Sequence, residues 1–438
     1  MIELKTAYDA VIIGGGLSGL TASIYLAKAG LRVLLVEKSN RLGGRALTVK
    51  KKGAYLNLGV HAFYQDGVGE EVLKELDLKL KGANPPPSVA AIWNNKVFPL
   101  PTGPVQLMTS KLFSFTGKIE LARFMMKLAK IDTTKLERVT FREWAEKEVQ
   151  DPMIRHVIYS ICRTNTFVPH PELLIASIAV KQLQRTFGGK AFYIEKGWVN
   201  LVDALKQKAE QASVTIVTGR SVVGIVPDKA GLRVSFTDGE SLVISSVIVA
   251  AGLGDACKLV KDANQNLLSN WKEQAHTIKA ACLDLVLHRL PNPSASFIAG
   301  FWLDAPIFYN NPTSVASHND DGDSVVIHMI KQLGENPSYP KEDEQHLEQA
   351  LDLMQPGWRE VEATRQFLPN ITVAHDFASI DKNGIYPGPE VPEIPGLYVA
   401  GDWTGHVGET LVDAVLAGAR RAAQAVIRQH KGMNGSDM

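Results

Sequence analysis

Residues 9–37 read DAVIIGGGLSGLTASIYLAKAGLRVLLVE, and this stretch decides the fold. A short apolar run, Asp9 to Ile13, leads into the pattern G-x-G-x-x-G at residues 14–19. An Ala- and Leu-rich stretch follows, and a second apolar run from Arg32 to Val36 ends at Glu37. The spacing predicts a strand, a tight turn, a helix and a parallel second strand, which together begin a dinucleotide-binding fold.

Each part of this turn suits a phosphate. Gly14 permits the tight turn, Gly16 lets backbone approach a pyrophosphate, and Gly19 lets the helix pack closely on the strand. The helix N-terminus offers free N–H groups and partial positive charge. Glu37 lies 23 residues after the first glycine, where a carboxylate accepts ribose hydroxyl groups and disfavours a 2′-phosphate. The motif alone is also compatible with a turn that binds nothing, but the strand, helix and acid together favour dinucleotide binding.

The composition is that of a globular protein. The length of 438 residues suggests about two or three domains. Hydrophobic residues make up 45% and charged residues 21%, which excludes disorder, collagen and coiled coil. The formal net charge of +1 lacks the excess of basic residues that is typical of a nucleic-acid-binding domain. Three scattered cysteines (Cys162, Cys257 and Cys282) are too few for a disulfide framework or a zinc cluster and fit a cytoplasmic protein without a metal site.

The uncharged stretch between Asp9 and Lys28 resembles a membrane span in length. Three consecutive glycines interrupt it and no basic segment precedes it, so strand, turn and helix explain it better than a span or a signal peptide. No other stretch is long enough to cross a bilayer. We therefore expect a cytoplasmic protein that is soluble or at most peripheral to the membrane.

The pattern of apolar and polar residues changes several times along the remaining chain. Helical patterns dominate from about residue 84 to residue 190. From residue 195 the pattern turns to a helix and several strands. Residues 275–375 alternate as an antiparallel sheet with one helix. The expected elements after residue 195 are helices at 201–212, 342–354 and 411–429 and strands at 214–217, 221–226, 232–236, 242–251 and 396–402.

These segments predict an α/β protein with a discontinuous, Rossmann-like domain built on a parallel sheet. Residues 1–84, 195–265 and 385–430 would form this nucleotide-binding domain. Residues 266–384 would form an α+β substrate-binding lobe, and residues 85–194 a helical insert.

Two further motifs bring in a resemblance to a known family. Residues 41–45 read R-L-G-G-R, and residues 397–423 read LYVAGDWTGHVGETLVDAVLAGARRAA. Both are similar to the flavin motifs of the flavin amine oxidase, protoporphyrinogen oxidase and phytoene desaturase superfamily, and Val222 to Ile225 with the VAAG strand resembles its middle elements. The similarity fades in the inserts. It implies FAD as the cofactor and a FAD-dependent oxidoreductase as the activity.

The resemblance also implies where FAD binds in the first segment. The pyrophosphate would lie on the glycine turn and the R-x-G-G-R motif, the adenosine ribose at Glu37, and the isoalloxazine beside a loop at residues 59–61. The residues assigned in this segment are Gly14, Gly16, Leu17, Ser18, Gly19, Glu37, Lys38, Gly43, Gly44, Arg45, Gly59, Val60 and His61.

In the central and last segments, Val222 would contact adenine through its backbone and Asp402 would bind the ribityl or pyrophosphate region. The start of the last helix would meet the flavin pyrimidine edge. The residues assigned here are Val222, Gly252, Gly401, Asp402, Thr410, Leu411 and Val412. Asp402 as a plain N-cap and Arg45 as a surface arginine are the alternatives. None of the cysteines is near the closing motif, so we expect non-covalent FAD.

Two features point to different substrates. Residues 408–411 lack the aromatic residue usual in the amine oxidases, and 410–415 resemble the desaturase and tetrapyrrole branches, except that Asp413 stands where glycine is usual. Against this, Lys279 resembles the lysine that holds a water at flavin N5 in amine oxidases, which would make it catalytic. A lysine at a strand start is more often a surface charge.

The segment 107–131 predicts a basic helix with an apolar face at Leu121, Phe124, Met125, Leu128 and Ile131. Such a helix can contact a membrane peripherally or cover an apolar tunnel. An ordinary amphipathic core helix is the alternative.

The leading hypothesis is a FAD-dependent oxidase or desaturase that removes hydride from a C–H bond of a small hydrophobic substrate such as an isoprenoid or a tetrapyrrole. The alternatives are an oxygen-using flavin amine oxidase and a non-enzymatic, lipid-handling protein of the GDP dissociation inhibitor type. The intact R-x-G-G-R and Gly401-Asp402 argue against the last. Substrate, electron acceptor and oligomeric state stay open.

Overall fold

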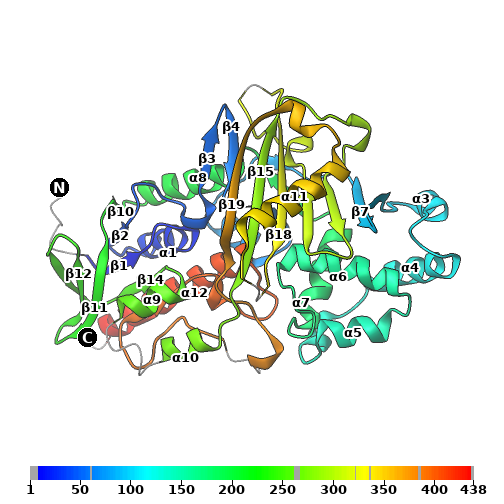
Figure 1. Cartoon of the computed structure of the whole chain (residues 1–438). Helices are drawn as coiled ribbons and strands as arrows, with labels where there is room; N and C mark the ends of the chain where they lie inside the picture. Colours follow the sequence, from blue (N-terminus) through cyan, green and yellow to red (C-terminus); the bar gives the residue numbers. More distant parts are fainter. Residues whose placement is uncertain are drawn as a thin grey trace.

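A five-stranded sheet carries the glycine turn at its centre (Figure 1). The computed structural model describes residues 8–59, 62–260, 267–320, 322–334, 337–382 and 386–435. All neighbouring strands of this sheet run parallel. In spatial order they are β10 (Thr215–Thr218), β2 (Val33–Glu37), β1 (Ala10–Ile13), β14 (Val247–Val249) and β20 (Leu397–Val399). The Rossmann-like fold is thereby confirmed, and its strands come from three separate parts of the chain.

Both faces of this sheet are buried, which explains why its strands read as continuous apolar runs. Ala10 and Ile12 face a helical layer, and Val11 and Ile13 face the opposite one. The first layer contains α1 (Leu17–Lys28), α2 (Val68–Glu75), α8 (Trp198–Gln211) and α12 (Val412–Gly435). The second contains α9 (Leu253–Leu259), α10 (Leu267–Glu273) and an antiparallel sheet of β11 (Val222–Asp228), β12 (Gly231–Phe236) and β13 (Ser241–Ile244).

The prediction of a single strand over residues 242–251 was wrong. Residues 241–244 belong to β13, which pairs antiparallel with β12, whereas 247–249 form β14 of the parallel sheet. The chain passes from one sheet to the other at Ser245 and Ser246, and an apolar pattern that continues on both sides hides this change.

The second lobe is built on a seven-stranded sheet with the order β19-β15-β18-β17-β16-β7-β8. Its neighbours are antiparallel except β16 and β7. Helix α11 (Pro340–Met354) packs on one face. The strands are β7 (Val89–Trp93), β8 (Lys96–Pro99), β15 (Ile278–Leu287), β16 (Ala299–Trp302), β17 (Ile307–Asn310), β18 (Val325–Gln332) and β19 (Glu362–Ala374).

The segment 85–194, expected to be a helical insert, therefore begins with two strands of the other lobe's sheet. Helices follow, and most of them share one core with the face of that sheet opposite to α11. They are α3 (Pro104–Thr109), α4 (Phe115–Leu128), α5 (Phe141–Glu148), α6 (Pro152–Thr166) and α7 (Ala176–Phe187).

The continuous helix expected over 107–131 is divided into α3 and α4. The Ser114 hydroxyl accepts the Gly117 N–H at 3.0 Å and begins α4 as its N-cap. Leu121, Phe124 and Leu128 are buried in the core, which confirms the amphipathic core helix for that face.

Short strands connect the lobes. β9 (Ala191–Ile194) pairs with both β5 (Phe63–Tyr64) and β6 (Gly82–Ala83), and β3 (Thr48–Lys51) pairs with β4 (Ala54–Asn57). Within the described ranges, no helix combines the length and the hydropathy that crossing a membrane requires.

Candidate functional site

The glycine turn between β1 and α1 leaves no room for side chains at Gly14 and Gly19. Gly14 has φ +110°, and a Cβ there would lie 2.4 Å from the carbonyl oxygen of Ala250. A Cβ on Gly19 would lie 1.9 Å from the carbonyl oxygen of Gly14. Gly16 instead lines the cavity, and a Cβ there would meet only the Gly43 carbonyl oxygen, at 3.9 Å. Turn, helix packing and phosphate approach are thus divided among the three glycines as their spacing predicts.

Glu37, the last residue of β2, is buried beside this turn. Its carboxylate accepts the Gly15 N–H at 2.6 Å and the Ser39 N–H at 2.8 Å. The acid therefore fixes the turn and also lines the cavity into which the turn opens.

Replacing Glu37 with Ala is expected to weaken FAD binding about tenfold to a hundredfold. Hydrogen bonds to a charged acceptor contribute roughly 1.5–3 kcal/mol, and the turn also loses the acceptor of its Gly15 N–H. Fluorescence titration of apoprotein with FAD measures the effect, and Glu360→Ala, an exposed acid of the other lobe, is the control. Equal affinities of Glu37→Ala and wild type would contradict the assignment.

Arg45 and Asp402 form an ion pair across the cavity floor, although 357 residues separate them. The guanidinium donates to both carboxylate oxygens, at 2.9 and 2.5 Å, and to the Val373 carbonyl at 3.1 Å. The backbone N–H of His375 also donates to Asp402, at 2.5 Å. Burial alone would raise the pKa of Asp402, but Arg45 and His375 outweigh it and hold that pKa well below its usual range. Asp402 thus stays charged, and Arg45, 43% exposed, presents its remaining surface to the cavity.

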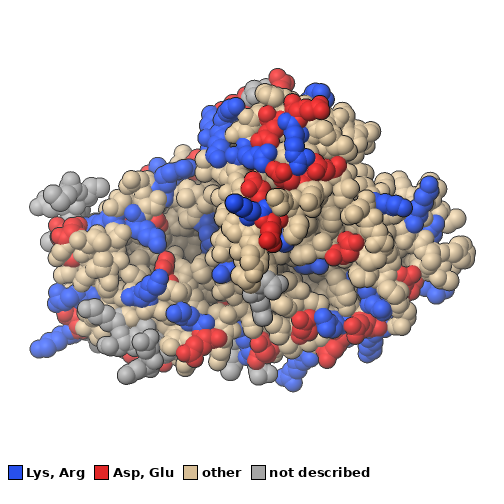
Figure 2. Space-filling model, in the orientation of Figure 1, with Lys and Arg blue, Asp and Glu red and all other residues tan. Residues whose placement is uncertain are grey.

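The cavity itself has a volume of about 1590 Å³ and reaches through both lobes. Ordinary ligand pockets hold about 300–1,000 Å³, so this one has room for a dinucleotide and a further molecule. Figure 2 shows that this face of the molecule is hollowed between the lobes.

The buried hydroxyl of Ser18, at the start of α1, lines the cavity and has no partner within the described chain. An unpaired hydroxyl, a helix N-terminus and three glycines fit a pyrophosphate group.

Most of the residues assigned from the sequence come together around this cavity. The structure does not place Gly19 or Thr410 in its lining; Gly19 supports the turn, and Thr410 accepts a hydrogen bond from Gln182 at 2.9 Å. Val60 and His61 lie outside the described residues. Those that line the cavity are Gly14, Gly16, Leu17, Ser18, Glu37, Lys38, Gly43, Gly44, Arg45, Gly59, Val222, Gly252, Gly401, Asp402, Leu411 and Val412.

Sequence reasoning missed several lining residues. Arg220, two residues before Val222, stacks on Phe236 and pairs with Asp238 and Glu240. His375 follows β19, and its imidazole fills the space beside Gly252, where a Cβ would lie 2.2 Å from Nε2. No local motif marks either residue, because strands far apart in the sequence bring them to the cavity.

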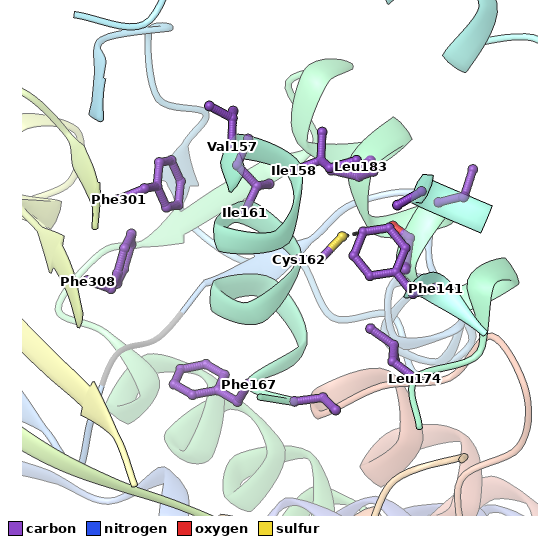
Figure 3. Close-up of a cluster of buried hydrophobic side chains, with 14 of the residues drawn as sticks. Phe141, Val157, Ile158, Ile161, Cys162, Phe167, Leu174, Leu183, Phe301 and Phe308 are labelled. Atoms are coloured by element: carbon purple, nitrogen blue, oxygen red, sulfur yellow. Dashed lines mark hydrogen bonds between the residues drawn. The ribbon is translucent and has the colours of Figure 1, made fainter. Parts of the chain in front are cut away.

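The half of the cavity within the second lobe is apolar (Figure 3). Val157 and Ile161 lie on the side of α6 that faces Phe301 and Phe308, whose rings are 5.4 Å apart. Among the described lining residues, 85–194 and 266–374 contribute no Asp, Glu, Lys, Arg or His.

Several polar side chains in and beside this half are paired with one another. The Tyr64 hydroxyl donates to Asn165 at 2.9 Å, and the Asn165 amide donates to Thr186 at 2.6 Å. The Asn310 amide donates to the Tyr193 hydroxyl at 2.7 Å. These walls therefore offer an uncharged surface.

The structure does not bring Lys279 to this site. One face of β15 packs against the helices of segment 85–194 and carries Ile278, Ala280 and Cys282. Side chains alternate along a strand, so residue 279 is directed to the opposite face of the sheet. Lys279 is exposed and is not among the residues that line the cavity. The surface-charge interpretation of this lysine agrees with that position.

Cys282 lines the cavity near Gly59, which its position in the sequence did not predict. Burial raises the pKa of the Cys282 thiol well above its usual value. A protonated thiol is a poor nucleophile. Non-covalent binding of the flavin stays our prediction.

Comparison with known proteins shows the family. The sequence matches the family "Flavin containing amine oxidoreductase" over residues 17–281, and the chain belongs to it. It is 43% identical over 75 residues to pseudooxynicotine dehydrogenase of a Pseudomonas species (16% of this chain, 15% of the relative). It is 30% identical over 168 residues to coproporphyrinogen III oxidase of Bacillus subtilis (34% and 36%). These matches thus span well under half the length of both curated relatives.

The fold agrees over nearly the whole chain with that of a solved oxidoreductase from Methanosarcina mazei. The TM-score is 0.75 at 19% identity, covering 95% of this chain and 99% of that one. The family defines a flavoprotein oxidoreductase with FAD as its cofactor, and the fold agrees with this family.

Proposed function

We propose that this protein removes hydride from a C–H bond of an uncharged, hydrophobic substrate, with an isoprenoid as the favoured class. The observation that carries the proposal is the apolar half of the cavity. Its described lining at 85–194 and 266–374 contains no Asp, Glu, Lys, Arg or His. Bound FAD supplies the hydride acceptor. The chain's own residues position the substrate by apolar contact and exclude water.

Charge separates the candidate substrates. An ammonium or carboxylate group buried without a partner costs several kcal/mol. A tetrapyrrole with carboxylate side chains would need Lys or Arg in the wall, and a cationic amine would need an acid or an aromatic cage. An isoprenoid needs neither, and wall groups such as Phe301 and Ile161 match it.

A flavin amine oxidase is the second candidate, because the family carries that description. That activity was expected to depend on Lys279 at the flavin. The exposed position of Lys279, on the side of β15 away from the cavity, argues against it.

The test is anaerobic bleaching of the bound flavin by an isoprenoid polyene precursor, a porphyrinogen and a panel of amines. We expect the isoprenoid to bleach the flavin. Val157→Phe, which narrows the apolar wall, should raise KM about tenfold with flavin content unchanged. Bleaching by amines alone would contradict the proposal.

Lys279→Met separates the two candidates without a known substrate. Stopped-flow reoxidation of the dithionite-reduced variant should match wild type. A tenfold slowing, about 1.4 kcal/mol in the barrier, would favour the amine oxidase instead.

A further inference from the structure

One end of the molecule exposes large apolar side chains on two adjacent helices, α3 and α4 (Figure 1). Val105 and Met108 of α3 are 74% and 71% exposed, and Phe115 of α4 is 75% exposed. Ile119 and Met126 of α4 are exposed too. We call these five residues the apolar end patch. Single exposed apolar residues are ordinary, but five on neighbouring helices mark an interaction surface.

The patch differs from the apolar face that the sequence indicated. On α4, Leu121, Phe124 and Leu128 turn inward to the core, whereas Phe115, Ile119 and Met126 recur at helical spacing on the outer side. Helix α3 has no buried residue at all. Packing within this chain therefore explains the inner face and leaves the outer one without a partner in the described residues.

Basic residues flank the patch. Arg123 is exposed on α4, Lys130 is exposed two residues after the end of α4, and Lys111 is exposed between the two helices. None of these three forms an ion pair with the described residues. Glu120, the one acid of α4, is directed to the backbone N–H groups of Gln150 and Asp151. In Figure 2 this end is largely tan, with blue groups beside it.

The apolar cavity reaches the same end. Pro104 and Leu107 of α3 and Ala122 and Met125 of α4 line it. Since α3 lies on the surface with no buried residue, part of the cavity wall is formed by a surface helix at the end of the molecule that carries the patch.

We infer that the apolar end patch docks on a lipid bilayer that carries anionic headgroups, and that the apolar substrate enters the cavity there directly from the lipid. Apolar side chains enter the acyl boundary while flanking Lys and Arg meet the anionic headgroups. This inference rests on the proposed function for the substrate, but the docking itself requires no turnover.

The test is co-sedimentation of the FAD-loaded protein with vesicles of phosphatidylcholine and phosphatidylserine in equal amounts, and with phosphatidylcholine alone. We expect binding to the mixed vesicles that weakens with salt. Met108→Asp/Phe115→Asp and Arg123→Glu/Lys130→Glu should each bind at least about tenfold more weakly. The charge control is Lys229→Glu/Lys341→Glu, on exposed lysines elsewhere, which should bind as wild type. Flavin content and melting temperature confirm that each variant is folded.

Two results would overturn the inference. One is equal vesicle binding by the patch variants and wild type. The other is a wild-type dimer in sedimentation velocity that ignores vesicles and dissociates in Met108→Asp/Phe115→Asp, because a second copy of the chain would then cover the patch. Vesicle binding without bleaching by any isoprenoid would instead overturn the proposed substrate and leave the docking in place.

Discussion

Arg45→Gln should leave the protein with little bound FAD and lower its free energy of unfolding by about 3 kcal/mol, the lower end of the range for breaking a buried ion pair. The side chain of Asp402 is only 3% exposed, and Arg45 is its cation. Without Arg45 a buried carboxylate would face the cavity in which the FAD pyrophosphate is expected. Repulsion between the two anions would then add to the lost hydrogen bonds.

Flavin content after gel filtration and the melting temperature measure both effects. The double variant Arg45→Gln/Asp402→Asn removes both charges, so it should recover most of the stability but not the FAD. Arg41→Gln is the matched control, since Arg41 belongs to the same motif but donates to the Thr48 carbonyl at 2.7 Å and does not line the cavity. An Arg45→Gln protein that keeps its flavin would contradict the role assigned to this residue.

The nucleotide half of the site was predictable because its parts are close in sequence. β1, the glycine turn, α1 and β2 occupy one continuous stretch, and steric limits at Gly14 and Gly19 make the pattern specific. Glu37 follows from the same spacing, since the end of β2 must lie beside the turn when the two strands are parallel neighbours.

The rest depended on long-range contacts that no local pattern specifies. The pairing of Arg45 with Asp402 joins two motifs that the sequence shows separately. β7 joins the second lobe's sheet by pairing with β16, about 200 residues further along the chain, and β8 follows by pairing with β7. The face of β15 on which Lys279 lies depends on which helices pack on each side of the sheet, and the sequence of the strand does not specify this.

Asp413 was noticed in the sequence only as a departure from the usual glycine, and the structure gives it a partner. Its carboxylate pairs with Arg185 of α7 at 3.0 Å and accepts the Gly69 N–H of α2 at 2.9 Å. Arg185 also pairs with Asp66 at 3.1 Å. The side chains of Arg185 and Asp413 are 4% and 6% exposed. This pair therefore ties the start of α12, next to the cavity, to the helices of the second lobe.

Arg185→Met should lower the free energy of unfolding by about 3–5 kcal/mol at neutral pH, because it leaves Asp413 buried without its cation. Burial already raises the pKa of Asp413, and Arg185 offsets only part of that rise. In the variant the folded-state pKa would rise further, so the folded protein would bind a proton that the unfolded chain releases. Stability should then fall as pH rises, and the deficit relative to wild type should be smaller at about pH 5 than at about pH 8.

Melting temperatures of wild type and variant across this pH range measure the deficit. Arg185→Met/Asp413→Asn should recover most of the lost stability, because Asn keeps an acceptor for the Gly69 N–H without a charge. The deficit that remains relative to wild type should no longer depend on pH. Arg420→Met is the control on α12; its half-exposed pair with Glu75 should contribute less than about 1 kcal/mol. A deficit that is the same at every pH would mean that lost packing around Arg185, and not the uncompensated charge of Asp413, causes the destabilisation.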